Sequence, residues 1–108
     1  MIKKTIKQSK TIKFELKDGS KIVGRAYLYL IKNNLHKRPY GLLEDVFVNN
    51  AYRGRGLGTQ LIEKVIKEAK KRKCYKLIST SRISRKNVHK FYQKLGFKKW
   101  GVEFRINF

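Results

Sequence analysis

Apolar and polar residues alternate along three segments in the first half of the chain, and this period of two predicts β-strands. In residues 11–16, three apolar side chains fall on one side and two charged side chains on the other. The pair Asp18-Gly19 is typical of a hairpin turn, and residues 21–31 and 41–48 continue as a second and a third strand. On the second strand, the apolar face is expected to carry Ile22, Ala26, Leu28 and Leu30.

The period then changes to that of an α-helix. Apolar residues four apart, from Leu57 to Ala69, predict an amphipathic helix of about 16 residues. The basic residues 70–73 lie at the C-terminal end of this helix, where positive charge stabilises the helix dipole. Residues 74–80 predict a fourth strand, and residues 88–95 predict a second helix that Gly96 closes. Alternation from Val102 to Phe108 predicts a last strand.

The predicted order is β-β-β-α-β-α-β, an α/β (α+β) fold with a mixed, mostly antiparallel sheet. The 108 residues suit a single domain, 1–108, with residues 1–10 frayed. No apolar run approaches a membrane span, and the N-terminus lacks the apolar stretch of a signal peptide. Cys74 is the only cysteine, and no Cys/His cluster suggests a metal. We therefore expect a cytoplasmic protein with no metal site.

The charge of the chain is its most unusual compositional property. There are 28 Lys and Arg residues against 7 Asp and Glu residues, which gives a formal net charge of +21. Such a charge favours polyanionic partners, including nucleic acid and nucleotide phosphates. The lysines are spread along the whole chain, so the alternative is that they simply solvate the surface.

A glycine-rich segment lies between the third strand and the first helix. It reads Arg53-Gly54-Arg55-Gly56-Leu57-Gly58-Thr59. Glycines allow tight turns that direct several N–H groups at one point, and a helix N-terminus adds partial positive charge. The spacing is neither that of a P-loop nor that of the dinucleotide-binding fingerprint. The segment predicts a pyrophosphate-binding loop, and the alternative is a turn with incidental arginines.

Two of the seven acidic residues, Glu44 and Asp45, are adjacent within the apolar third strand. A regular strand places neighbours on opposite faces, so at least one carboxylate is expected in an interior face or pocket. There it is a candidate general base or amine ligand. The alternative is that one residue pairs with a lysine while the other is solvated.

Two ordered motifs resemble those of the GNAT family of N-acetyltransferases. The family's acetyl-CoA motif reads Arg/Gln-x-x-Gly-x-Gly/Ala, and Arg53, Gly56 and Gly58 fill it. The run 87–97, which includes Tyr92 and ends in Leu-Gly-Phe, is similar to the family's second cofactor segment. The resemblance covers residues 11–108 and implies a GNAT-like acyl-CoA N-acyltransferase fold. Taken alone, Tyr92 is better explained as a core residue, and the resemblance reverses this in favour of a functional role.

Residues 43–48, 74–78 and 101–104 are more closely similar to glucosamine-6-phosphate N-acetyltransferases. In that subfamily an aspartate stands near the end of the fourth strand, where this chain has Thr80. The family also begins with a strand and one or two helices that wall the acceptor site. Only about ten residues precede the first hairpin here, so we expect an N-terminally shortened member.

The resemblance implies acetyl-CoA as cosubstrate and assigns roles to particular residues. Its pyrophosphate would bind the N–H groups of residues 53–59, and its pantetheine would follow the backbone of Val46, Phe47 and Val48, beside a bulge. Glu44 would take the proton of the amine, Tyr92 would protonate the departing thiolate, and Asn87 would hold the cofactor. The acceptor would contact Glu44, Asp45 and Thr80.

The main alternative is a basic nucleic-acid-binding module without catalytic activity. Tyr27, Tyr29, Tyr40 and Phe47 would supply stacking surfaces for bases. For an enzyme, the acceptors that remain open are an amino sugar phosphate and an amine carried by a protein or RNA. Further expected partners are a second copy of the chain, through the last strand, and nucleic acid bound non-specifically. No membrane partner is expected.

Overall fold

The computed structural model describes all 108 residues and divides them into two compact units. The first unit is Met1–Ile78 and the second is Ser79–Phe108. Because the chain forms two such units, the expectation of a single domain over residues 1–108 stays a prediction. None of the helices has both the length and the apolar character that crossing a bilayer requires.

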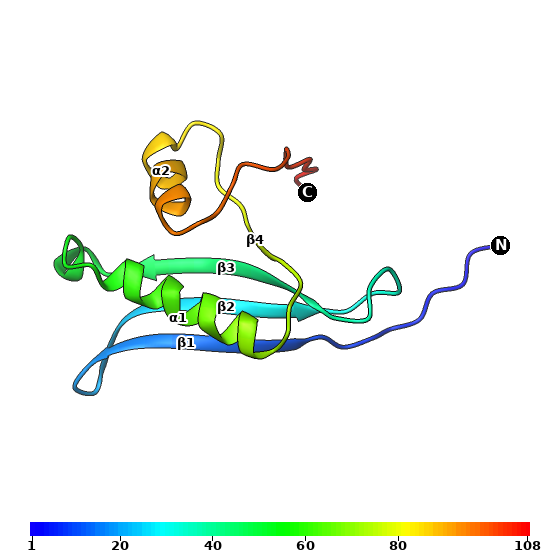
Figure 1. The fold of residues 1–108 in the computed structure, drawn as a ribbon, viewed down its shortest axis with the longest axis horizontal. Helices are drawn as coiled ribbons and strands as arrows, with labels where there is room; N and C mark the ends of the chain where they lie inside the picture. Colours follow the sequence, from blue (N-terminus) through cyan, green and yellow to red (C-terminus); the bar gives the residue numbers. More distant parts are fainter. The chain divides into compact units, whose positions relative to one another are not determined.

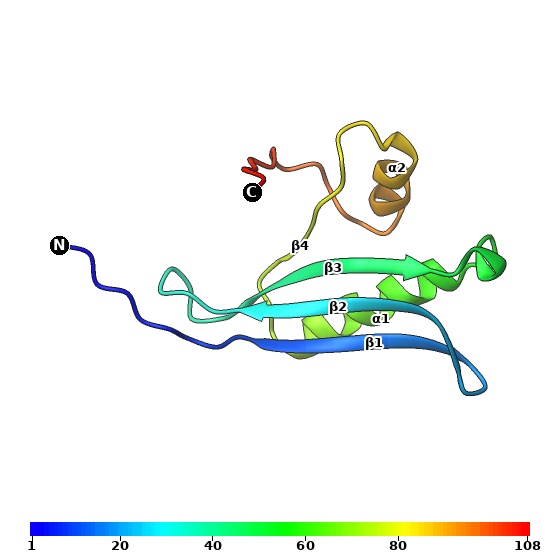
Figure 2. The same ribbon diagram turned by 180° about the vertical axis from the view of Figure 1, so that it is seen from behind.

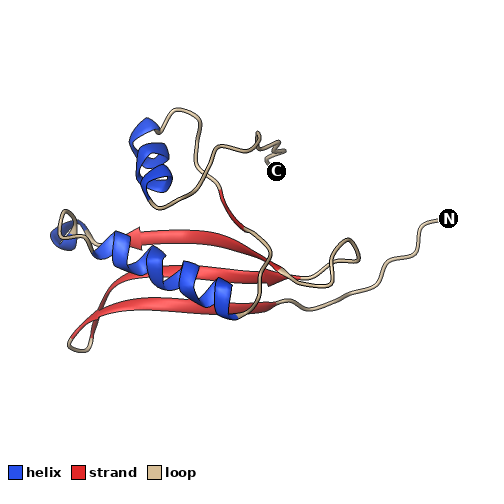
Figure 3. Cartoon of the chain, in the orientation of Figure 1, coloured by secondary structure: helices blue, strands red, loops and turns tan.

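The first unit is built on an antiparallel meander. Its strands are β1 (Lys10–Asp18), β2 (Lys21–Ile31) and β3 (Tyr40–Val48). The short strand β4 (Leu77–Ser79) is the neighbour of β3, so the order in the sheet is β1-β2-β3-β4 (Figure 3). The turn between β1 and β2 contains Gly19 at φ +60°, which confirms the predicted hairpin. The predicted mixed, mostly antiparallel α+β fold is thus confirmed.

The helix α1 (Leu57–Lys71) lies across one face of β1, β2 and β3 (Figures 1 and 2). Its buried side chains recur at the predicted helical spacing because they face the sheet. Its last turn carries Lys70 and Lys71, as the sequence predicts. The core between helix and sheet consists of Val23, Ala26, Leu28, Leu43, Leu61, Ile62, Val65 and Ala69. The other face of the three strands has no helix of this unit against it.

One predicted core residue lies outside. Ile22 is 52% exposed, whereas Val23 is buried. The β1–β2 register shifts here, because Leu16 pairs with Gly24 while the next residue, Lys17, pairs with Ile22. Val23 is therefore the extra residue of a β-bulge, and the alternation that predicted Ile22 on the core face breaks at that point.

The second unit contains the helix α2 (Lys86–Lys94), which confirms the predicted second helix. Gly96, at φ +102°, donates its N–H to Gln93 O, and Phe97 donates its N–H to Tyr92 O. These two bonds make a Schellman motif, in which the glycine adopts the left-handed conformation as predicted. The rings of Tyr92 and Phe97 pack edge to face at 5.3 Å across the motif.

The predicted last strand is not formed. Residues 102–108 contain neither helix nor strand, and Val102, Phe104, Ile106 and Phe108 are all exposed. A strand is stable only when a neighbour pairs with its backbone, and the sheet contains no strand from this segment. Alternation of apolar residues is compatible with a strand but does not provide the partner.

Candidate functional site

The glycine-rich segment forms a sharp connection between β3 and α1. The chain leaves β3 through a single 3-10 turn, Asn50–Tyr52, whose cap Asn49 accepts a hydrogen bond from Ala51 N. Gly54 and Gly56 then adopt φ +78° and +75°, a left-handed conformation that disfavours residues with a Cβ. No protein atom lies within 4 Å of the position of a Cβ on either glycine. The loop therefore needs glycine for its conformation, and its surface stays accessible.

The N-terminus of α1 presents backbone donors without protein acceptors. Its N-cap is Gly56, which has no side chain to cap the helix, and the first turn contains no acidic residue. The first intrahelical bond runs from Gln60 N to Gly56 O at 3.1 Å. The N–H groups of Leu57, Gly58 and Thr59 donate to no protein atom. With Arg53 and Arg55 beside them, these donors form a site suited to an anion.

Side-chain contacts hold this loop against β3 and the β1–β2 turn. Arg53 donates from Nε to Val48 O at 2.8 Å, and its guanidinium lies 5.9 Å from the centre of the Phe47 ring. Arg55 lies 5.2 Å over the ring of Tyr52. The hydroxyl of Tyr52 donates to Asp18, which raises the pKa of Tyr52. The start of the loop, at Tyr52 and Arg53, is thus anchored to the end of β1 and to β3.

The third strand contains a bulge at Asp45. Tyr27 pairs with Glu44 and Arg25 pairs with Phe47, so Asp45 and Val46 together stand opposite Ala26. Asp45 has φ +53°, an unusual conformation for a residue other than glycine. The bulge that the resemblance implies is present. It also corrects one expectation, because Glu44 and Asp45 do not point to opposite faces but line the same pocket.

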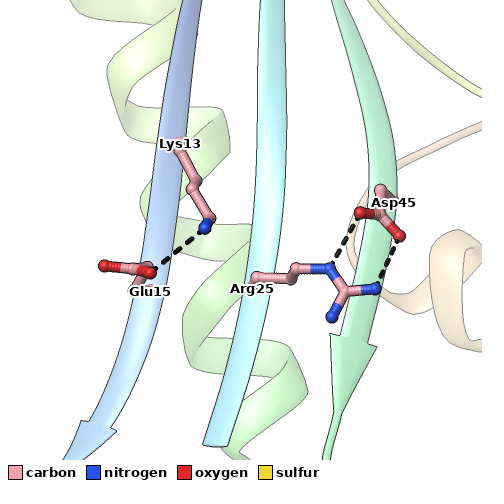
Figure 4. Close-up of polar contacts among 4 residues, drawn as sticks. All are labelled: Lys13, Glu15, Arg25 and Asp45. Carbon is pink, nitrogen blue, oxygen red and sulfur yellow. Dashed lines mark hydrogen bonds and ion pairs between the residues drawn. The ribbon is translucent and has the colours of Figure 1, made fainter. Parts of the chain in front are cut away.

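Arg25 holds the bulge through a two-point ion pair with Asp45 (Figure 4). Its Nε and its Nη2 donate to the two carboxylate oxygens at 2.8 and 3.1 Å. The guanidinium also lies 4.9 Å from the centre of the Phe47 ring. Hydrogen bonding to Arg25 lowers the pKa of Asp45 in the folded protein. The ion pair therefore stabilises the fold fully at pH values above the ordinary carboxyl pKa. This stabilisation is lost as the pH falls through the lowered pKa of Asp45.

We expect substitutions of Asp45 to separate its conformation from its charge. Both Asp45→Ala and Asp45→Gly remove the ion pair. The alanine keeps a Cβ in a left-handed residue, whereas the glycine removes that Cβ and gives the unfolded chain more backbone freedom. At pH 7 the alanine variant should melt about 4–8 °C below the glycine variant. Thermal unfolding followed by circular dichroism measures both. Equal melting temperatures would mean that the left-handed conformation at residue 45 costs no more than the backbone freedom that glycine adds to the unfolded chain.

Glu44 is the carboxylate that remains available beside the bulge. It is half-buried and takes part in none of the chain's ion pairs. Asp45 is bound by Arg25, and Glu15 pairs with Lys13 at 3.2 Å on the neighbouring strand β1 (Figure 4). A carboxylate without a cationic partner is able to accept a proton from, or bind, an incoming amine.

The other predicted site residues lie in the second unit. Asn87 is in the first turn of α2 and lines a pocket of about 340 Å³ with Ser84, Arg85, Lys86 and Val88. Tyr92 lies near the end of α2, where its ring contacts Phe91 and Phe97. Thr80 is exposed and follows directly after β4. Their roles stay predictions, as do those of the first unit's residues.

Sequence reasoning missed several residues around Glu44. Arg25 was not a candidate, although its charge within an otherwise apolar strand was a usable signal. Ser9, Tyr29, Ile31 and Leu42 line the pocket that holds Glu44, and they come from β2, β3 and the segment before β1. No group of three or more His, Cys, Asp or Glu residues is placed to bind a metal ion.

The chain is similar to acetyltransferases over most of its length. The model of the Acetyltransferase (GNAT) family matches residues 3–97. The chain is 39% identical, over 88 residues, to a glucosamine 6-phosphate N-acetyltransferase of Trypanosoma brucei brucei, covering 81% of this chain and 58% of that protein. Over 66 residues it is 42% identical to glucosamine 6-phosphate N-acetyltransferase 1 of Dictyostelium discoideum, covering 61% of this chain and 40% of that protein.

A solved structure has the same fold. The glucosamine-6-phosphate N-acetyltransferase of Arabidopsis thaliana superposes with a TM-score of 0.81 at 25% identity, covering 91% of this chain and 67% of that one. The chain spans about half the length of the curated relatives it matches. The family match extends over the meander, the glycine loop and both helices. This chain therefore belongs to the GNAT family of acetyltransferases.

Proposed function

We propose that this chain transfers an acetyl group from acetyl-CoA to a primary amine. The observation that carries the proposal is the loop 53–59, in which the N–H groups at the start of α1 are unpaired and accessible, and in which two of the seven residues are arginines. Donors of this kind bind phosphate groups without a large rearrangement. They would hold the pyrophosphate of the cofactor.

The pantetheine arm would follow β3. This strand has nine residues, whereas its neighbour β4 has only three, so β4 is too short to pair along the whole edge of β3. The backbone of Val46, Phe47 and Val48, just beyond the bulge, would then hydrogen-bond to the amide groups of the pantetheine. A backbone N–H there would also stabilise the oxyanion that forms on the thioester.

The chemical step needs a base and an acid. The amine arrives largely protonated at pH 7, and Glu44, directly or through water, would take its proton. The neutral nitrogen attacks the thioester carbonyl, the new C–N bond forms and the C–S bond breaks. The leaving thiolate takes a proton from Tyr92 to become CoA, and the second proton that the attacking nitrogen loses, passed through water, restores the Tyr92 hydroxyl. Asn87 would hold the cofactor.

The acceptor would contact Glu44, Asp45 and Thr80. The names of the relatives favour an amino sugar phosphate, and a basic chain would also attract an amine carried by RNA or by an acidic protein. A nucleic-acid module without activity is less well supported. Two of its four candidate stacking residues, Tyr27 and Tyr29, lie on the strand face that also carries Glu44. Glu44 pairs with Tyr27 across β2 and β3, so a carboxylate lies beside the surface on which bases would stack.

Acetyl-CoA is expected to raise the melting temperature of the protein. A hundredfold excess over the Kd stabilises the folded state by about 2.7 kcal/mol, which corresponds to about 10 °C for a domain of this size. Gly56→Val should abolish this shift, because its side chain would stand in the path of the phosphate. Differential scanning fluorimetry at moderate salt measures the shift of each variant against its own melting temperature without ligand.

Gly58→Ala is the matched control. Gly58 lies within the first turn of α1, so alanine fits its backbone conformation and the family motif accepts it. This variant should keep the full shift. A folded wild-type protein that shows no shift with acetyl-CoA or CoA, but binds RNA at high salt, would contradict the proposed function and support the nucleic-acid module.

A further inference from the structure

The sheet face turned away from α1 carries a pocket at Glu44. It is a shallow depression that is widely open to solvent, with a volume of about 480 Å³. It lies on the first unit alone, where strands β2 and β3 and the segment before β1 meet. It is lined by Ser9, Tyr29, Ile31, Leu42, Glu44 and Asp45.

No lysine or arginine lines this pocket, although the chain contains 28 of them. The guanidinium of Arg25 already has two of its N–H groups bound to Asp45 at 2.8 and 3.1 Å. The pair Arg25–Asp45 is therefore close to neutral, and Glu44 is the one carboxylate of the pocket without a cationic partner. The six lining residues therefore offer a carboxylate to a positive ligand atom and include no cation for a phosphate group.

The rest of the lining is mainly apolar. Tyr29, Ile31 and Leu42 are half-buried, and Tyr29 pairs with Leu42 across β2 and β3. Together they form an apolar wall next to Glu44. Among the lining side chains, only the hydroxyls of Ser9 and Tyr29 are neutral hydrogen-bonding partners for a sugar. A hydrocarbon chain or aromatic ring, in contrast, would bury apolar surface against this wall.

We propose that the acceptor is a primary amine on an apolar carbon skeleton, without a phosphate group, and that this pocket binds it. The inference rests on the proposed acetyl transfer and departs from the acceptor that the relatives' names suggest. The ammonium group pairs with Glu44 and gives its proton to that carboxylate. The nitrogen then attacks the thioester, the acetyl C–N bond forms and the C–S bond breaks. The nitrogen loses its second proton, and the thiolate gains one to become CoA, so the protons balance.

The test compares two acceptors, 2-phenylethylamine and glucosamine 6-phosphate, by the release of free CoA thiol from acetyl-CoA. We expect kcat/KM to be at least about 10-fold higher for 2-phenylethylamine, since apolar contacts of this size change selectivity about 10–200-fold. Leu42→Arg places a cation in the pocket and should reduce kcat/KM for 2-phenylethylamine more than about 10-fold. Leu35→Arg adds the same charge to an exposed loop residue and should leave it unchanged.

The outcomes separate this inference from the proposed function. Faster acetylation of glucosamine 6-phosphate would overturn the apolar acceptor and leave acetyl transfer intact. If neither amine is acetylated, calorimetric titration of 2-phenylethylamine into the protein, with and without CoA, decides. Binding that Leu42→Arg abolishes and Leu35→Arg retains would support the pocket, and no binding would overturn it. Absence of acetyl-CoA binding in the thermal assay would count against the proposed function alone.

Discussion

Replacing Glu44 with glutamine is expected to lower kcat by about 10²–10⁴-fold, the usual contribution of a general base. Glutamine keeps the size of the side chain but accepts no proton from the amine. Because Glu44 takes part in no ion pair, the substitution leaves no unpaired cation behind, and the fold should keep its melting temperature. The rate of CoA release under saturating acetyl-CoA measures the effect.

The pH dependence of this variant distinguishes a base from a residue that only shapes the pocket. Without Glu44, solvent must supply the neutral amine, so the rate should rise with pH toward the pKa of the acceptor, about 10 for an alkylamine. Glu63→Gln removes another unpaired carboxylate, on the exposed side of α1, and is the matched control. Equal kcat values for the Glu44 and Glu63 variants would exclude Glu44 from the chemical step.

The Tyr92→Phe variant is expected to lose a comparable factor, about 10²–10⁴-fold in kcat, with little change in affinity for CoA. Phenylalanine preserves the ring that contacts Phe91 and Phe97, so the Schellman end of α2 should stay intact. Only the proton donor to the thiolate is removed. Steady-state kinetics for kcat and calorimetry for CoA binding separate these two effects.

If Tyr92 has only a structural role, a different result is expected. Phenylalanine would then be tolerated, with near-normal kcat, because the packing of the ring is unchanged. Tyr75→Phe controls for loss of a tyrosine hydroxyl elsewhere, since Tyr75 packs on His36 with ring centres 4.0 Å apart in the first unit. An unchanged kcat in the Tyr92 variant, measured where chemistry limits the rate, would assign protonation of the thiolate to water.

The conformation of the glycine-rich loop 53–59 was predictable because its signal is local. Left-handed glycines, a helix start and two arginines lie within seven consecutive residues, and each acts through its own backbone or charge. The helices were predictable for the same reason, since their apolar spacing and the closing Gly96 lie within the elements they define. Such signals do not depend on which distant segment packs against them.

The bulges at Val23 and Asp45 were not predictable in this way. Strict alternation assumes a regular strand, and one inserted residue moves every later side chain to the other face. For this reason Ile22 was expected in the core, and Glu44 and Asp45 were expected on opposite faces. The bulge at Asp45 goes with a pairing to Arg25, 20 residues earlier in the chain, which no local pattern contains.

The exposed apolar residues of 102–108 affect how the protein behaves in concentrated solution. A segment with alternating apolar side chains and unpaired backbone groups is able to pair with like segments of other molecules once it is extended. Two features oppose this: Glu103 and Arg105, joined by an ion pair of 2.7 Å, interrupt the apolar positions, and the net charge of +21 makes the molecules repel one another. Because salt screens that repulsion, colloidal stability of the protein is greatest at low ionic strength.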